Sequence, residues 1–60
     1  MKVWTLNELF RLTRTELFRL HGEIVCEVAR TPEGSPEHDI ALANLRRIAR
    51  ALALPNLAPG

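Results

Sequence analysis

An eight-residue pattern of polar and apolar positions occurs twice in succession near the N-terminus of this chain. The block Thr-x-x-Glu-Leu-Phe-Arg-Leu covers residues 5–12 and is repeated without a gap at residues 13–20. In each copy a threonine is followed three residues later by a glutamate, the pairing in which two side chains satisfy free backbone N–H groups at a helix start. The repeat therefore predicts two helix starts, at Thr5 and at Thr13.

An apolar staple accompanies each predicted start. Trp4 is expected to pack against Leu9, and Leu12 against Leu17, because these residues stand one position before each cap and four after it. A continuous helix through Thr13 is the alternative, since threonine is tolerated inside helices. A shift of eight residues turns a helix by roughly 80°, however, so one straight helix would spread the apolar residues of the two copies over a broad arc. We expect a bend at Thr13 that turns both copies toward one core.

The pattern predicts a short extended arm at residues 1–4, a first helix at residues 6–12 and a second helix at residues 14–30. The second helix is strongly amphipathic. Its polar side carries alternating charges whose default role is solvation, namely Glu16, Arg19, Glu23, Glu27 and Arg30. The apolar residues fill about half of the helix circumference, and they are Leu17, Phe18, Leu20, Ile24, Val25, Val28 and Ala29.

Residues 31–35 form the clearest break in the chain. Pro32 disfavours a helical conformation for the residue before it, and Gly34 can adopt a positive φ. Ser35 is a good cap for a new helix, and Pro36 suits the first helical position because its missing N–H has no partner there. These signals predict a third helix that starts at Pro36.

The third helix is predicted to cover residues 36–54 and to end before a proline, with a loose tail at residues 55–60. Its apolar face is predicted to contain Ala41, Leu45, Ile48, Ala49 and Leu52, with Leu42 at one margin. The short connection makes the second and third helices antiparallel neighbours. We therefore predict an all-α chain with a single domain over residues 1–60, in which a short N-terminal helix precedes an antiparallel helical hairpin to form a three-helix mini-bundle.

Sixty residues give a thin core, which metals, disulfides or self-association often supplement. The single cysteine, Cys26, excludes an intramolecular disulfide, and together with His21 and His38 it lacks the ligand spacing of structural zinc sites. We predict no metal and no cofactor. The sequence has no secretory signal pattern and no apolar run long enough for a membrane span, so a cytoplasmic protein without membrane contact is expected.

Self-association follows from the width of the apolar arc on the second helix, which the other two helices are not expected to cover completely. An apolar remainder would favour a homodimer. Near the middle of the same arc, His21 is interpreted as a buried or interfacial histidine, with a pH-sensitive or partner-contacting role left open. His38 is interpreted as a solvated residue at a helix start, and Cys26 as an unreactive residue at the boundary of the polar face.

Charge is nearly balanced over the whole chain, at +1, but it is unevenly distributed. Residues 46–60 contain three arginines and no acid, namely Arg46, Arg47 and Arg50, and Asp39 lies in the same sector of the predicted third helix. A solvated basic face is the simplest interpretation. The alternatives are a docking surface for an acidic protein or for a phosphate backbone, because guanidinium groups bind both carboxylates and phosphates.

Catalytic chemistry is not expected from this chain. Its only serine, Ser35, is used as a helix cap, and tyrosine is absent. The sequence has no glycine-rich phosphate loop, no Cys–His pair and no paired carboxylates in a predicted cleft. A non-enzymatic role is therefore predicted.

Four segments resemble small helical proteins carried on mobile elements of proteobacteria, and together they span most of the chain. They are residues 4–9, the second Thr-x-x-Glu-Leu block, residues 32–37 and residues 42–48. Accessory proteins of this size include anti-CRISPR inhibitors, most of which act without catalysis by occupying a surface of a CRISPR effector complex. The resemblance implies an activity of that kind but assigns no residue, because such inhibitors share no common motif.

The preferred hypothesis is a small helical protein that binds another protein, as an anti-CRISPR inhibitor binds a CRISPR effector complex, through Arg46, Arg47, Arg50 and Asp39. A DNA- or RNA-binding regulator is the first alternative. The second predicted helix argues against a helix-turn-helix, since Glu16, Glu23 and Glu27 occupy the outer face where a recognition helix needs donors and cations. A dimerisation module, in which the hairpin pairs with its copy as a four-helix bundle, is the second alternative.

Overall fold

The computed structural model describes residues 2–53. Within that range the chain forms three α-helices and no strand: α1 spans Leu6–Phe10, α2 spans Arg14–Arg30 and α3 spans Pro36–Ala53. The predicted all-α class is confirmed. The predictions for the tail and for the end of the third helix beyond Ala53 lie outside the described residues.

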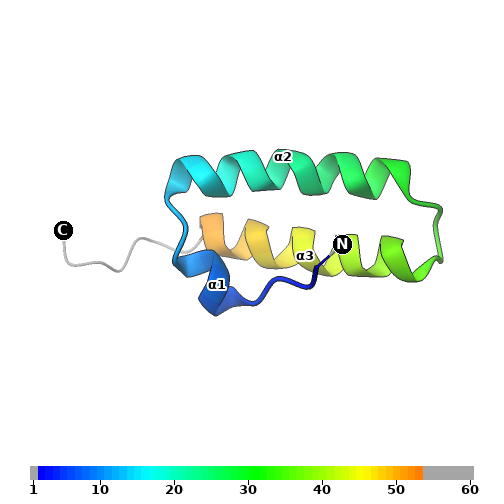
Figure 1. Ribbon diagram of the computed structural model, residues 1–60, viewed down its shortest axis with the longest axis horizontal. Helices are drawn as coiled ribbons and strands as arrows, with labels where there is room; N and C mark the ends of the chain where they lie inside the picture. Colours follow the sequence, from blue (N-terminus) through cyan, green and yellow to red (C-terminus); the bar gives the residue numbers. More distant parts are fainter. Residues whose placement is uncertain (1, 54–60) are drawn as a thin grey trace.

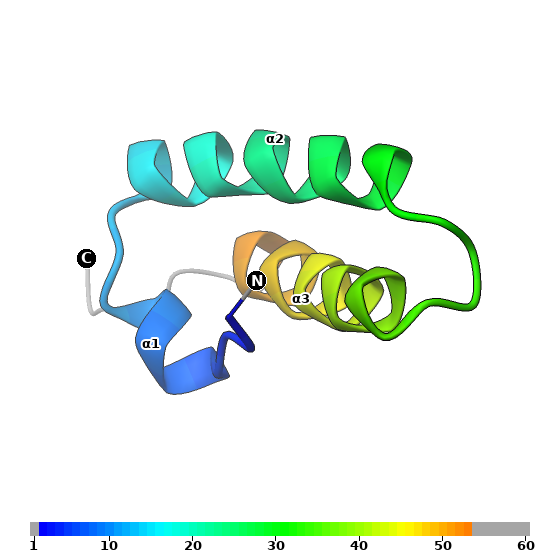
Figure 2. The same ribbon diagram turned by 45° about the vertical axis from the view of Figure 1, so that its right-hand side comes forward.

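The helices pack around α3. The α2 and α3 helices run antiparallel side by side, which confirms the predicted hairpin, and α1 lies against the C-terminal half of α3 (Figure 1). The extended arm before α1 crosses the middle of α3, and α1 and α2 lie on different sides of that helix (Figure 2). Helix α3 is thus covered from two directions, whereas α2 is covered mainly by α3.

Both copies of the repeat begin a helix with the predicted reciprocal cap. The Thr5 hydroxyl accepts a hydrogen bond from the Glu8 backbone N–H at 3.2 Å, and the Glu8 carboxylate accepts one from the Thr5 N–H at 3.0 Å. The same two bonds join Thr13 and Glu16, at 3.1 and 2.8 Å. Thr13 is extended, with φ −70° and ψ 163°. The bend is confirmed, and the continuous helix through Thr13 is wrong.

Helix α1 is shorter than predicted, because it ends at Phe10 and not at Leu12. The N–H groups of Arg11 and Leu12 donate to carbonyls three residues back, those of Glu8 at 3.2 Å and Leu9 at 3.1 Å. These tight bonds close the last turn. The helix must end here since Thr13 needs an extended backbone to cap α2, and Leu12 is partly buried against the core.

The connection between α2 and α3 uses the residues that the sequence predicted. Gly34 has a φ of 84°, a conformation that favours glycine. The Ser35 hydroxyl donates to the Pro32 carbonyl at 2.8 Å and accepts from the His38 N–H at 3.1 Å, so it caps α3 as predicted.

The interpretation of His38 as a solvated residue is wrong. Its ring is half-buried, and Nδ1 lies 3.0 Å from the Thr31 hydroxyl at the end of α2. The same hydroxyl donates to the Glu27 carbonyl at 2.8 Å. His38 therefore ties the first turn of α3 to the last turn of α2, because the tight loop brings these two helix ends together.

The core contains one layer of side chains from the three helices. Its buried hydrophobic members are Leu9, Leu17, Ile24, Ile48 and Ala51, and the partly buried residues around them are Trp4, Leu6, Leu12, Leu20, Val28, Leu45 and Leu52. The face predicted for the third helix is wrong in part, since Ala49 is exposed whereas Asn44 and Ala51 are buried. The arm and α1 cover the side of α3 that carries Asn44 and Ala51, which shifts the buried face away from Ala49.

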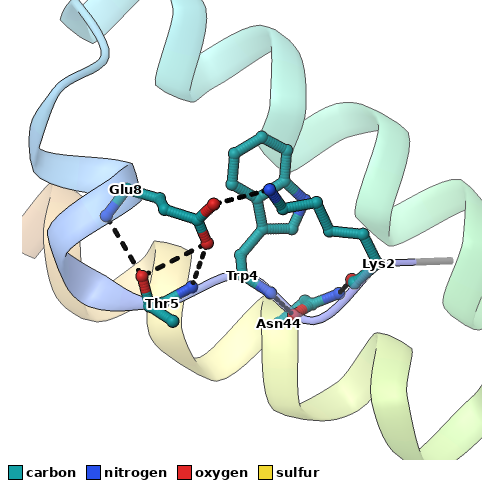
Figure 3. Close-up of polar contacts among 5 residues, drawn as sticks. All are labelled: Lys2, Trp4, Thr5, Glu8 and Asn44. Atoms are coloured by element: carbon teal, nitrogen blue, oxygen red, sulfur yellow. Dashed lines mark hydrogen bonds and ion pairs between the residues drawn. The ribbon is translucent and has the colours of Figure 1, made fainter.

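Asn44 is the buried polar residue of this core, with no exposed surface. Its side chain accepts a hydrogen bond from the Trp4 N–H at 2.8 Å and donates one to the Lys2 carbonyl at 2.7 Å (Figure 3). The Lys2 ammonium lies 4.5 Å from the centre of the Trp4 ring and 2.6 Å from the Glu8 carboxylate. These contacts fix the arm on α3, a role for Asn44 that its sequence pattern did not predict.

Candidate functional site

Among residues 2–53, two exposed surfaces are candidates for contact with another molecule, and the first is on α3. Arg46 stands two residues from both Asn44 and Ile48, which are fully buried, so it lies about 200° around the helix from each of them. Arg46 and Arg50 are exposed, one turn apart, and Asp39 is exposed two turns before Arg46. We name Arg46, Arg47, Arg50 and Asp39 the arginine surface. Its arginines project away from α1 and α2, with the exception of Arg47.

Arg47 differs from its two neighbours. It is half-buried on the flank of α3, and its Nη1 atom is shielded from solvent without a hydrogen-bond partner among residues 2–53. The prediction that all three arginines lie on the exposed side is therefore wrong for Arg47. Packing holds part of its side chain in place, so it loses less conformational freedom than a fully exposed arginine when a ligand binds.

The charges of the arginine surface are not neutralised by neighbours within the described chain. The ion pairs among residues 2–53 join Lys2 to Glu8 and Arg30 to Glu27, at 2.6 and 2.5 Å. Asp39 and Arg46 are seven residues apart, or about 10 Å along the helix, which is too far for a direct ion pair. The face therefore presents two unpaired cations at one end and an unpaired carboxylate at the other.

The second free surface is on α2 and is apolar. Phe18 is 57% exposed and Val25 is 43% exposed, although the sequence placed both in the apolar arc of this helix. Gly22, Cys26 and Ala29 are exposed beside them. We name Phe18, Gly22, Val25, Cys26 and Ala29 the Phe18 surface. The expectation that part of the arc stays uncovered is confirmed.

Arg14 borders the Phe18 surface. The guanidinium carbon lies 5.7 Å from the centre of the Phe18 ring, within the range of a cation–π contact. His21, near the middle of the arc, is half-buried, and Cys26 is exposed as its predicted boundary position implies. Neither residue belongs to a group of potential metal ligands within the described chain.

Two further observations concern metal binding and membrane spanning among residues 2–53. Among residues 2–53, no three His, Cys, Asp or Glu side chains lie close enough together to hold a metal ion. None of the described helices combines the length and apolar character needed to cross a membrane.

The pKa values of the two capping glutamates are lowered by hydrogen bonds that also stabilise the fold. The pKa of Glu8 is lowered, first by its hydrogen bond from Lys2 and then by that from the Thr5 N–H. The pKa of Glu16 is lowered chiefly by the hydrogen bond from the Thr13 N–H. Both carboxylates are engaged in helix caps, and both lie apart from the arginine surface.

Comparison with protein-family models, with curated proteins and with solved structures found no match to this chain. The function must therefore be inferred from the charge, exposure and packing of its own residues.

Proposed function

We propose that this protein acts by binding another protein through the arginine surface of α3, without catalysis. The supporting observation is that Arg46 and Arg50 are exposed and unpaired within residues 2–53, on the side of α3 opposite to its buried residues. A single arginine guanidinium binds a carboxylate through two parallel hydrogen bonds, and arginine is enriched among the residues that dominate the binding energy of protein interfaces.

An acidic protein surface suits this face better than nucleic acid does. Asp39 lies on the same face, and Glu37 precedes it in the first turn of α3. A phosphate backbone would be repelled by these carboxylates, whereas a protein can place a cation against Asp39 and acids against the arginines. A DNA- or RNA-binding regulator remains the alternative, and its salt dependence distinguishes it.

In the specific form favoured by the resemblance to mobile-element proteins, the partner is a CRISPR effector complex in the bacterial cytoplasm and the protein is its inhibitor. This form is tested by expressing the chain in strains with active CRISPR interference and counting phage plaques. Restored plating supports it, and unchanged interference against a panel of CRISPR types contradicts it. The broader proposal of protein binding has its own test.

That test compares two pairs of substitutions that remove equal charge. Arg46→Ala with Arg50→Ala should leave helicity and melting nearly unaltered while weakening partner binding by about 1 to 3 kcal/mol per central contact. Arg19→Ala with Arg30→Ala, on α2, is the control and should bind like the unmodified protein. Partners are captured from host lysate on each variant and compared by quantitative mass spectrometry, and affinity is then measured on the purified partner.

A pair of substitutions that preserves charge distinguishes bidentate binding of a carboxylate from general electrostatic attraction. Arg46→Lys with Arg50→Lys keeps the positive charge but loses bidentate geometry, so it should weaken a carboxylate contact and largely preserve a general electrostatic one. Full binding by the alanine pair contradicts the proposal. A random duplex that is retarded at low salt and released steeply as salt rises would support the nucleic-acid alternative instead.

A further inference from the structure

Gly22 lies in the middle of α2, where no contact within the described chain requires a glycine. Glycine in a helix interior is destabilising relative to alanine, because it loses more backbone freedom on folding. Apart from its two neighbours in the chain and the nearby backbone of its own helix, a Cβ atom built at this position would meet no atom within 4 Å. The helix therefore carries a destabilising residue that no internal contact demands, at the centre of an exposed apolar face.

The neighbours of Gly22 on this face have the spacing of a helical packing hole. Gly22, Val25, Cys26 and Ala29 stand at positions i, i+3, i+4 and i+7, the four corners into which a side chain from a facing helix inserts. All four are exposed. Three of them are small, so the hole is wide enough for a large side chain.

Phe18, on the same helix, is a large side chain placed so that it could fill this hole in a second copy. Phe18 lies one turn before Gly22, and the centre of the hole lies about one turn after it. A two-fold axis at Gly22, with the helices antiparallel, therefore brings each Phe18 over the hole of the other copy. The surface is complementary to itself, which is the requirement for a symmetric dimer.

We propose that α2 pairs antiparallel with α2 of a second copy of this chain, crossing at Gly22, with Phe18 of each copy inserted among Gly22, Val25, Cys26 and Ala29 of the other. The glycine lets the two backbones approach closely. The pairing leaves the arginine surface of α3 free, and it does not depend on the function proposed above.

The charges around the Phe18 surface favour a second copy in this orientation. Arg14 is brought level with Arg30 of the other copy, on the opposite side of the helix pair, so these two like charges add no attraction. Arg19 and Glu23 flank the same side of the surface, and the antiparallel axis sets Arg19 of one copy within about 3 Å, along the helix, of Glu23 of the other. Opposite charges thus meet at the rim.

The expected dimer is weak because the contact is small. A helix of 17 residues is about 25 Å long, so one pair of such helices is expected to bury less than the roughly 1,200 to 2,000 Å² of a typical stable interface. The association should therefore depend on concentration and become evident at high micromolar protein.

Sedimentation equilibrium tests the surface, and the repeated block supplies a matched control. Phe18→Ser should weaken dimerisation at least tenfold, whereas Phe10→Ser, at the equivalent and 53% exposed position of the first copy, should leave it unchanged. Circular dichroism of both variants confirms that the fold is kept. A wild-type chain that stays at 6.8 kDa throughout this range overturns the proposal, and so does equal association of the two variants.

Gly22→Ala gives a second test, in which monomer stability and dimer affinity should change in opposite directions. The added methyl should raise the melting temperature of the dilute monomer and lower the dimer association constant several-fold, because the crossing can no longer be as close. A variant that associates as strongly as the wild type contradicts a crossing at Gly22.

Disulfide trapping tests the orientation. In a Cys26→Ala background, Thr15→Cys combined with Ala29→Cys should give a covalent dimer on mild oxidation, since positions 15 and 29 lie equally far from Gly22 on opposite sides. Each single substitution is the control and should remain monomeric. Dimers formed by the singles would indicate parallel helices, and no dimer from the double variant would exclude the pairing, so either result overturns the proposal.

Discussion

The two copies of the repeated block begin in the same way and end differently. Leu9 and Leu17 occupy equivalent positions and are buried, at 0% and 6% exposure, while the phenylalanines next to them, Phe10 and Phe18, are 53% and 57% exposed. The first copy nevertheless forms a helix of five residues and the second starts a helix of seventeen. Identical local patterns therefore determine how a helix starts and which side it buries, but not how far it continues.

The length of each helix depends on the residues that come directly after the block. After the first copy comes Thr13, which must be extended to cap the next helix, so α1 stops at Phe10. After the second copy the amphipathic pattern continues, and the helix ends only at Arg30, before Thr31 and Pro32. The start signal at Thr13 thus also acts as the stop signal for α1.

The largest expected effect comes from the leucines that both copies bury. Leu9→Ala and Leu17→Ala should each lower the free energy of unfolding by about 2 to 5 kcal/mol, because each leaves a cavity in a core only one layer thick. That is a large part of the stability of a small domain. Urea or thermal unfolding followed by circular dichroism measures it. A fully stable Leu9→Ala variant would show that the first copy does not contribute to the core as the second does.

The caps should give an intermediate effect. Thr5→Ala and Thr13→Ala each remove the hydroxyl that accepts the N–H of a glutamate, at a cost of about 1 kcal/mol. The same unfolding measurement gives both values side by side. A Thr13→Ala variant as stable as the unmodified chain would mean that Thr13 is inside a helix and that the second copy has no separate start.

The smallest expected effect is the pH dependence of stability that comes from Glu8 and Glu16, the equivalent glutamates of the two copies. The pKa values of Glu8 and Glu16 are both lowered in the folded chain, so each carboxylate gives its full stabilisation above the pKa of the unfolded chain and loses it as the pH falls through the folded pKa. Melting temperature should therefore decline as the pH falls below about 4.

Only Glu8 has a lysine partner among the described residues, and this separates the two copies. Lys2→Ala should raise the pKa of Glu8 and leave that of Glu16 unchanged, since the Lys2 hydrogen bond is the largest cause of the shift at Glu8 and has no counterpart at Glu16. Titration of the side-chain carboxyl signals by NMR gives both values in one experiment. Equal changes at the two residues would indicate that Lys2 acts through the fold and not through its contact with Glu8.

Much of this fold could be predicted from local sequence, because caps and breaks depend on neighbouring residues. The threonine caps, the bend at Thr13, the positive φ of Gly34 and the Ser35 cap all depend on such neighbours. The role of Asn44 could not be predicted in this way, because its partners, Lys2 and Trp4, are forty or more residues away in the chain. A signal was present, since Asn44 continues the apolar spacing of Ala41, Ile48 and Ala51.

The candidate surfaces were harder to predict, because exposure depends on which helices cover which face. Arg46 and Arg50 lie outside as expected, but Arg47 is held against the flank of α3. Phe18 and Val25 read as core residues from periodicity alone, yet α3 is not wide enough to cover the full arc of α2. A helix with an apolar arc broader than its neighbours can cover indicates a surface left for contact with another molecule.

Two separate helix starts in adjacent copies of one block determine this fold, and backbone chemical shifts of residues 10–14 test them most directly. We predict extended-backbone shifts at Thr13, with helical shifts resuming at Arg14. Unbroken helical shifts from Leu6 to Arg30 would contradict this prediction, because the two buried leucines could then no longer face the same core.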